Sequence, residues 1–415
     1  MSAPKLLYLV TEDWYFCSHR LPLARAARAA GFRVSVVTRV QQHAEQIRAA
    51  GLELIPLNLL RRSANPVREL ATVGKIAATY RRVRPDIVHH VAMKPVLYGS
   101  LAAWWAGTPH VVNALAGLGY VFSSSDAKAR LLRPLVETGL RALLNRGNSR
   151  LIIQNPDDIA LLTGQGVVDA ARTVLIRGSG VDLSRFEPGA EPEGEPLVVL
   201  PARMLRDKGV EEFVAAARQL KRAGVSARFA LVGDPDPENP AAISLSQLGA
   251  WRNEGVVECW GWRDDMAEVF KQATLVCLPS YREGLPKALI EAAACERALV
   301  TCDVPGCREV VRHGDNGLLV PARDSAALAQ ALRALLDNPS LRQAMARRSR
   351  ERAVQEFSVE RVIGDTLALY RAVLNSSSSP ALPPSAATVG VGQGEGGEEE
   401  RGSERALAEG KGERT

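Results

Sequence analysis

The stretch TLVCLPSYREGLPKALIEAAACE, residues 274–296, decides the fold class of this chain. It opens with an apolar run, passes through a short loop with proline and glycine, and continues as an alanine-rich segment of helical composition. A buried strand that is followed within a few residues by a helix is one step of a parallel sheet wound with helices. The stretch therefore predicts a strand–loop–helix unit, with Pro286 at the first helical position.

The same alternation extends through most of the chain. Apolar runs such as residues 5–10, 86–91 and 197–203 are separated by amphipathic or alanine-rich segments. The pattern pauses at residues 177–196, which are rich in glycine, proline and acidic residues. We expect an α/β protein of two doubly wound parallel-sheet (Rossmann-like) domains that face a cleft. The cleft is expected between the carboxyl edges of the two sheets.

The predicted boundaries divide the chain into four parts. They are a first domain (1–184), a second domain (185–357), a closing helix (358–375) and a low-complexity tail of Ser, Pro, Gly and Glu (376–415). The tail has almost nothing to bury, so we expect it to be disordered. The N-terminal residues are expected to form a strand and no signal peptide, which argues for a cytoplasmic protein.

The charge, the lengths of the apolar runs and the cysteine spacing limit which classes of function this chain can have. Residues 1–182 carry 23 Lys and Arg against 12 Asp and Glu, or +11, although the whole chain carries only +6. A basic half suits a phosphorylated ligand, an anionic membrane surface or nucleic acid, but no nucleic-acid motif accompanies it. No apolar run reaches the roughly 20 residues that span a bilayer. The six cysteines are scattered without a C-x-x-C pair, so we expect reduced thiols.

Two glutamates flank the predicted start of the helix in the opening stretch. Glu283 lies just before it and Glu291 lies in its second turn. The free N–H groups of Gly284, Leu285 and Lys287 are expected to point into the cleft, where the positive end of the helix dipole favours phosphate. With one carboxylate on each side of a bound diphosphate, one can accept hydrogen bonds from the hydroxyls of a sugar and the other from those of a ribose. A helix with an acidic residue near its N-terminus is also common without any ligand.

Two cations precede another helix of the second domain. Arg203 ends a predicted strand, and Lys208 opens the next helix after a short loop. Arginine offers a planar fork and lysine a mobile point charge, which together suit a diphosphate. The spacing of Arg203 and Lys208 is by itself weak evidence for a phosphate site. Combined with the N-terminus of the helix that follows Glu283 and with the two glutamates, it predicts a nucleotide-sugar site.

At this point a family resemblance becomes specific. Residues 201–213, 261–270 and 279–321 resemble the donor half of the family 4 glycosyltransferases with the GT-B fold, and Glu283 and Glu291 match the E-x7-E pair of that family. The resemblance implies a nucleotide-sugar donor site in the second domain and an acceptor site in the first. It also implies retention of anomeric configuration and no cofactor or metal.

The resemblance implies a role for each matching donor residue. The counterparts of Arg203 and Lys208 bind the donor diphosphate, that of Glu283 contacts the transferred sugar, and that of Glu291 binds the ribose. Residues 284–286 are expected to contribute to donor binding. Two positions depart from the family pattern, because Ala298 stands where a proline is usual and Glu296, at the expected end of the helix, where a glycine is usual. If Glu296 adopts the left-handed conformation, it costs on the order of 1 kcal/mol.

The first domain is similar to a narrower subgroup, which extends polyprenyl-diphosphate-linked sugars for surface polysaccharides or glycans. Residues 11–34, 86–107 and 109–124 carry this similarity, although the first of these has no Gly-Gly loop. Many family members have a histidine where this chain has an asparagine at position 113. The residues expected on the acceptor side are His19, Arg20, His90, Lys94 and Asn113.

Residues 127–146 form a basic amphipathic segment. Such a helix can lie in a membrane interface, or it can turn its leucines toward the protein core. Its apolar stripe consists of Leu131, Leu132, Leu135, Val136, Leu140, Leu143 and Leu144. We expect a peripheral protein on the inner face of the cell membrane.

The expected activity is transfer of a hexose or N-acetylhexosamine. Two other functions are considered as alternatives. A sugar-nucleotide 2-epimerase shares the architecture but needs no acceptor, and a non-enzymatic protein that binds anionic membranes does not need the donor residues. An Asp-x-Asp at positions 234–236 is not expected to hold a metal, since Arg203 and Lys208 supply the positive charge. UDP as the nucleotide is an expectation from the subgroup.

Overall fold

The computed structural model describes residues 3–59, 65–118 and 127–375, and these contain two parallel sheets. The low-complexity tail (376–415) lies outside the described residues. The first sheet has seven strands in the order β3-β2-β1-β4-β5-β6-β7. Their bounds are β1 Lys5–Glu12, β2 Arg33–Arg39, β3 Glu53–Pro56, β4 Ile87–Val91, β5 His110–Leu115, β6 Ser149–Ile153 and β7 Thr173–Leu175.

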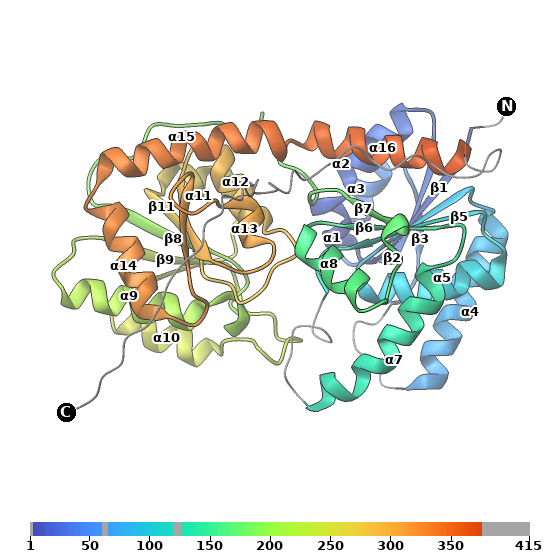
Figure 1. Cartoon of the computed structure of the whole chain (residues 1–415), viewed down its shortest axis with the longest axis horizontal. Coiled ribbons are helices and arrows are strands. Elements are labelled where there is room, and N and C mark those ends of the chain that lie inside the picture. The colour runs from blue at the N-terminus through green and yellow to red at the C-terminus, as the bar shows by residue number, and fades with distance from the viewer. Residues whose placement is uncertain (1–2, 60–64, 119–126, 376–415) are drawn as a thin grey trace, which may run out of the picture. The chain divides into compact units, whose positions relative to one another are not determined.

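The second sheet has six strands in the order β10-β9-β8-β11-β12-β13 (Figure 1). Their bounds are β8 Leu197–Pro201, β9 Arg228–Val232, β10 Glu258–Gly261, β11 Leu275–Leu278, β12 Ala298–Cys302 and β13 Gly317–Val320. Every strand pair in both sheets is parallel. The prediction of two doubly wound α/β domains is confirmed.

Helices connect the strands and cover the sheets. In the first part of the chain they are α1 Asp13–His19, α2 Leu21–Ala29, α3 Ala44–Ala49, α4 Pro66–Val83, α5 Met93–Ala106, α7 Ala127–Leu144, α8 Pro156–Gly164 and η1 Ala170–Arg172. Those after β7 are η2 Arg206–Lys208, α9 Val210–Arg222, α10 Leu245–Asn253, α11 Met266–Gln272, α12 Lys287–Ala294, α13 Cys307–Val310, α14 Ser325–Leu336, α15 Pro339–Glu356 and α16 Val359–Asn375.

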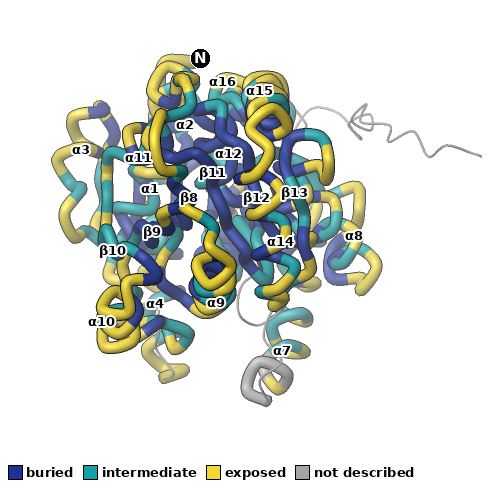
Figure 2. Tube along the Cα trace, turned by 90° about the vertical axis from the view of Figure 1, so that its left-hand side faces the viewer, coloured by how far each residue is buried: buried dark blue, intermediate teal, exposed yellow. Residues whose placement is uncertain are grey.

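Strand β1 shows how the first sheet is packed on both faces. Leu6, Tyr8 and Val10 belong to the core beneath α1, α2, α3 and α16, whereas Leu7 and Leu9 belong to the core beneath α4 and α5. Alternate side chains of a strand point to opposite faces, so an unbroken apolar run is required when helices cover both. The strands β8, β11 and β12 of the second sheet are likewise buried throughout, and the outward sides of α9 and α10 are exposed (Figure 2).

The closing helix α16 packs on the first domain, although α15, which precedes it, packs on α12 and β12 of the second (Figure 1). Val362, Tyr370 and Val373 of α16 join the core that contains β1. The hydroxyl of Tyr370 lies 2.9 Å from that of Tyr8 and 2.5 Å from Nδ1 of His89. The last described helix thus completes the core of the first domain.

Helix α12 ends in a Schellman motif. The N–H of Arg297 donates to the carbonyl of Ala292 and that of Glu296 to the carbonyl of Ala293. Glu296 has φ = 59°, so the expectation of a non-glycine residue in the left-handed conformation is confirmed.

Two further expectations from the sequence concern the state of the cysteines and membrane-spanning segments. All six cysteines lie in the described part of the chain and none forms a disulfide. Within the described residues, no helix combines the length and the apolar character that crossing a membrane requires.

Candidate active site

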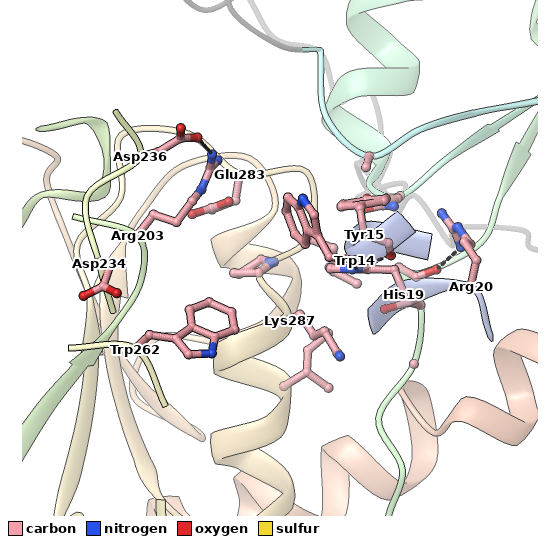
Figure 3. A pocket seen from close by; sticks show the side chains of 18 of the residues that line it. Trp14, Tyr15, His19, Arg20, Arg203, Asp234, Asp236, Trp262, Glu283 and Lys287 are labelled. Atoms are coloured by element: carbon pink, nitrogen blue, oxygen red, sulfur yellow. Dashed lines mark hydrogen bonds and ion pairs between the residues drawn. The ribbon is translucent and has the colours of Figure 1, made fainter. Parts of the chain in front are cut away.

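A cavity of about 610 Å³ lies between the carboxyl edges of the two sheets, and residues from both domains line it (Figure 3). Arg203, Trp262 and Glu283 come from loops after β8, β10 and β11 of the second sheet. His19 and Arg20 come from the segment after β1 of the first. The predicted cleft is therefore present, with ligand-facing side chains at the strand ends as expected for such folds.

Glu283 lies at the mouth of helix α12. Its Oε1 accepts hydrogen bonds from Nζ of Lys208 at 2.5 Å and from Oγ of Ser280 at 2.7 Å. Pro286 is the N-cap of α12, one position earlier than the first-turn place that we expected, and the helix begins at Lys287. Leu285, Pro286 and Lys287 line the cavity next to Glu283.

Gly284 approaches the backbone of the first domain closely. A Cβ at this position would lie 2.0 Å from the carbonyl oxygen of Ala116, so only glycine fits. We expected Gly284 to contribute to donor binding, but its observed neighbour is protein and it is not one of the described residues that line the cavity.

Arg203 and Lys208 each pair with a carboxylate. Arg203 Nη1 lies 2.7 Å from Oδ2 of Asp236, which belongs to the Asp-x-Asp of residues 234–236. Arg203 lines the cavity with a side chain that is 44% exposed, whereas Lys208 is 19% exposed and reaches the site through Glu283. The two predicted cations thus lie at the carboxyl edge of the same sheet, beside the helix mouth.

Glu291 is buried in the second turn of α12 and is not one of the described residues that line the cavity, although Lys287 and Ile290 of the same helix are. Burial raises the pKa of its carboxyl, while Lys287, whose Nζ lies 3.2 Å from Oε1 of Glu291, acts in the opposite direction. Lys287 Nζ also donates to the carbonyl of Ser18 at 3.0 Å, so it connects α12 to the first domain.

His19 and Arg20 lie together on the first-domain side of the cavity. The His19 ring stacks on Tyr15, with centroids 4.2 Å apart. Burial, and then the charges of Lys287 and Arg20, lower the pKa of His19 to about 3, so the ring is neutral at physiological pH. Arg20 is only 4% exposed, and its Nη1 donates weakly to the carbonyl of Gly178 at 3.5 Å. Its buried Nε has no hydrogen-bond partner among the described residues.

The other expected acceptor-side residues do not line the cavity. His90 and Asn113 are fully buried, with His90 Nδ1 2.8 Å from Asn113 Oδ1 and His90 Nε2 3.0 Å from the hydroxyl of Tyr80. Ser100 completes this network by donating to Asn113 Oδ1. The expected acceptor role of His90 and Asn113 is corrected to an interior position, because the side chains of these strand residues point to the face covered by α4 and α5.

Lys94 is the third correction. Its Nζ lies 2.7 Å from Oε2 of Glu69 and over the ring of Tyr98, and it does not line the cavity. Sequence reasoning missed Trp14 and Trp262, which line the cavity from opposite domains (Figure 3). Trp262 is 68% exposed, and the signal for it was an aromatic residue directly after a strand end.

The amphipathic segment of residues 127–146 divides its stripe between core and solvent. Leu140 and Leu144 are fully buried, whereas Leu131 and Leu135 are 81% and 71% exposed. The second half of the stripe therefore turns toward the protein core, whereas Leu131 and Leu135 of the first half face away from it.

Comparison with known families supports this geometry. The model of "Glycosyl transferase 4-like" matches residues 5–155, and that of "Glycosyl transferases group 1" matches residues 195–338. The two matches fall on the first and the second sheet respectively.

Several curated proteins are similar over most of their length. An N,N'-diacetylbacillosaminyl-diphospho-undecaprenol alpha-1,3-N-acetylgalactosaminyltransferase from Campylobacter jejuni is 29% identical, over 81% of this chain and 90% of that protein. An alpha-maltose-1-phosphate synthase from Mycolicibacterium smegmatis is 30% identical, over 69% and 79% respectively. A UDP-Gal:alpha-D-GlcNAc-diphosphoundecaprenol alpha-1,3-galactosyltransferase from Escherichia coli is 23% identical, over 74% and 81%.

Solved structures show the same fold. Sucrose-phosphate synthase from Thermosynechococcus elongatus superposes with a TM-score of 0.74 at 23% identity, covering 90% of this chain and all of that one. The sheets, the cleft residues, the two family models and these relatives agree, and the chain belongs to the family 4 glycosyltransferases with the GT-B fold.

Proposed function

We propose that this glycosyltransferase moves a hexose or N-acetylhexosamine from a nucleotide sugar, UDP being the expected nucleotide, to a saccharide carried on polyprenyl diphosphate. The product would be an intermediate of surface polysaccharide or glycan assembly. The observation that carries the donor half is the grouping of Arg203, Lys208 and Glu283 at the mouth of α12.

Each donor-side group has a distinct proposed task. Arg203 and Lys208, together with the N–H groups at the start of α12, stabilise the negative charge that grows on the departing diphosphate. Glu283 orients hydroxyls of the transferred sugar. Glu291 lies farther along the helix and accepts hydrogen bonds from the ribose.

We propose that transfer retains the anomeric configuration. Glu283 accepts hydrogen bonds from both Lys208 and Ser280, which lowers its nucleophilicity. The bond from the anomeric carbon to the diphosphate oxygen breaks while the acceptor oxygen bonds to that carbon from the same face. The acceptor hydroxyl loses its proton to the departing phosphate oxygen. Closure of the domains would exclude water and limit hydrolysis.

The buried guanidinium of Arg20 is the argument for a second anionic group of the ligands on the first-domain side of the cavity. A guanidinium that is 4% exposed and has no described carboxylate partner is costly, because burial removes its hydration. An acceptor diphosphate would offset this cost. His19 is neutral beside it and can hydrogen-bond the acceptor without adding charge. The Campylobacter and Escherichia relatives are named for diphospho-undecaprenol acceptors, which agrees with this reading.

The acceptor lipid would lie in a membrane, so we also propose peripheral binding at the cytoplasmic face. Leu131 and Leu135 are highly exposed on the N-terminal half of α7, the helix that follows β5 along the chain. The excess positive charge of residues 1–182 favours an anionic lipid surface.

Product analysis tests the proposal. The protein is incubated with a panel of UDP-hexoses and UDP-N-acetylhexosamines, with and without a polyprenyl-diphosphate-linked monosaccharide. Transfer that depends on the lipid acceptor, with retained configuration by NMR, is the expected result. Isomerisation of the nucleotide sugar without acceptor would instead identify a 2-epimerase, and no reaction with any diphosphate-linked acceptor would refute the acceptor class.

A further inference from the structure

The loop that carries Glu283 is held by the first domain on both sides of that residue. Before Glu283, the guanidinium of Arg282 donates to Oδ1 of Asp158. After it, the carbonyl of Gly284 accepts a hydrogen bond from Nδ2 of Asn155 at 2.7 Å. Asn155 and Asp158 form the N-terminus of α8, which follows β6 of the first sheet.

Asn155 uses both its acceptor and its donor in this contact. Its Oδ1 accepts from the N–H of Asp158 at 2.7 Å and caps α8, while its Nδ2 also donates to Oδ2 of Asp158 at 3.1 Å. The side chain is 0% exposed and Asp158 is 1% exposed. An amide meets this need to accept and donate at once, whereas an ionised carboxylate of the same size has no proton to give to the Gly284 carbonyl.

Gly284 meets the first domain a second time through its α-carbon. The carbonyl oxygen of Ala116, after β5, leaves no room for a side chain at this position. The backbone on one side of Glu283 is therefore held between the ends of β5 and β6, and the residue on the other side is held by an ion pair.

We propose that Asn155 and Asp158 are positioning residues, which fix Glu283 in its sugar-binding orientation through Gly284 and Arg282 when the two domains are closed. This inference rests on the proposed role of Glu283. Neither Asn155 nor Asp158 lines the cavity, so both act through the loop and not on the substrates. Separation of the domains would release the loop on both sides of Glu283 at once.

The chain offers a matched control on the same helix. Asp157 precedes Asp158 and pairs with Arg308 of α13 at 3.4 Å, also between the domains. This pair is about 40% exposed at both residues, and the hydrogen bonds of the Arg308 side chain in the described structure go to Asp157 and Asp303 and not to residues 281–285. Loss of Asp157 removes an interdomain contact but leaves the loop held.

Asn155→Ala is the first test. We expect kcat to fall about 10- to 100-fold, because a misplacement near 1 Å at the reacting centre costs that much. The donor KM should stay within about threefold, because Arg203, which lines the cavity, is held by Asp236 and not by this loop. Asp157→Ala should leave both constants near those of the wild type. Arg282→Lys keeps the charge and should retain more activity than Arg282→Ala.

Hydrogen exchange separates this inference from the proposed function. Amides of residues 281–285 should exchange faster in Asn155→Ala than in the wild type or Asp157→Ala, whichever nucleotide sugar proves to be the donor. Faster exchange and lower kcat together support the inference. Unchanged exchange in that loop, a higher donor KM at unchanged kcat, or an equal effect of Asp157→Ala would overturn it. If the wild type transfers no sugar, the proposed function is refuted. The hydrogen-exchange result then decides by itself whether Asn155 and Asp158 hold the loop of Glu283.

Discussion

Lys208 Nζ and Glu283 Oε1 lie 2.5 Å apart, so a proposed phosphate-binding cation and the proposed sugar-binding carboxylate form an ion pair. Arg203 is paired as well, but with Asp236, which belongs to a different loop. A donor diphosphate must therefore compete with Asp236 for Arg203, whereas Lys208 can keep Glu283 in place while the sugar binds. The two cations are expected to respond differently to substitution.

Arg203→Ala should lower kcat/KM by about 10²- to 10³-fold, the cost of removing one group that stabilises the departing charge. Its side chain is 44% exposed, so the melting temperature should change little. Arg206→Ala is the control, because Arg206 lies in the same loop, pairs with Glu211 and does not line the cavity. Near-normal turnover of Arg203→Ala would remove the assignment of the diphosphate site.

Glu291→Ala should abolish discrimination between UDP and its 2'- and 3'-deoxy analogues. If the carboxylate accepts from ribose hydroxyls, the wild type binds at least one deoxy nucleotide about tenfold more weakly, a typical value for one such hydrogen bond. Titration calorimetry of both proteins with the three nucleotides measures this. Equal discrimination in the wild type and the variant would show that Glu291 does not contact the ribose.

A double substitution of Leu131 and Leu135 by aspartate should weaken binding to vesicles that contain anionic lipid. Both leucines are highly exposed, so folding should be unaffected. Leu245→Asp provides the comparison, since Leu245 is 77% exposed but lies on α10 of the second domain. Co-sedimentation with vesicles gives the readout, and equal binding of all three proteins would exclude α7 as the membrane contact.

Glu296→Gly should raise the free energy of unfolding by about 1 kcal/mol, because glycine adopts φ = 59° without a Cβ penalty. Glu296→Ala keeps the Cβ and should bring no such gain. Urea denaturation of the three proteins measures the difference, and a gain shared by the alanine variant would point to the charge of Glu296 and not to its backbone.

Stability should decline as the pH is lowered below about 6.5. Burial lowers the pKa of His90 from 6.5 to about 4, so between these values the unfolded chain binds a proton that the folded chain does not. At pH 5 this costs about 2 kcal/mol relative to neutral pH. His90→Gln should show a correspondingly smaller loss between pH 7.5 and pH 5 in urea titrations. Identical losses would place the acid sensitivity elsewhere.

The donor half of the site was predictable because its signals are local. Glu283, the helix mouth and Glu291 lie within nine consecutive residues, and helix geometry fixes their relation. Arg203 and Lys208 follow one strand of the same sheet. The fold was predictable for a related reason, since strands buried on both faces leave long apolar runs.

The acceptor half was predicted less well because it depends on which face a side chain takes. His89 and His90 are adjacent in one buried strand and point into opposite cores, one toward Tyr370 and the other toward Tyr80. The sequence shows that they differ in face but not which helices cover each face. Contacts such as Asn155 with Gly284 join residues 129 apart and leave no periodic signal.

The return of α16 to the first domain has a consequence for synthesis. The hydroxyls of Tyr8 and Tyr370 touch, although the residues are separated by 362 positions. On the ribosome, both sheets have been made before the segment that closes the core over β1 emerges. The first domain therefore starts to fold earliest and finishes last, and until α16 arrives it exposes an apolar face that a chaperone can recognise.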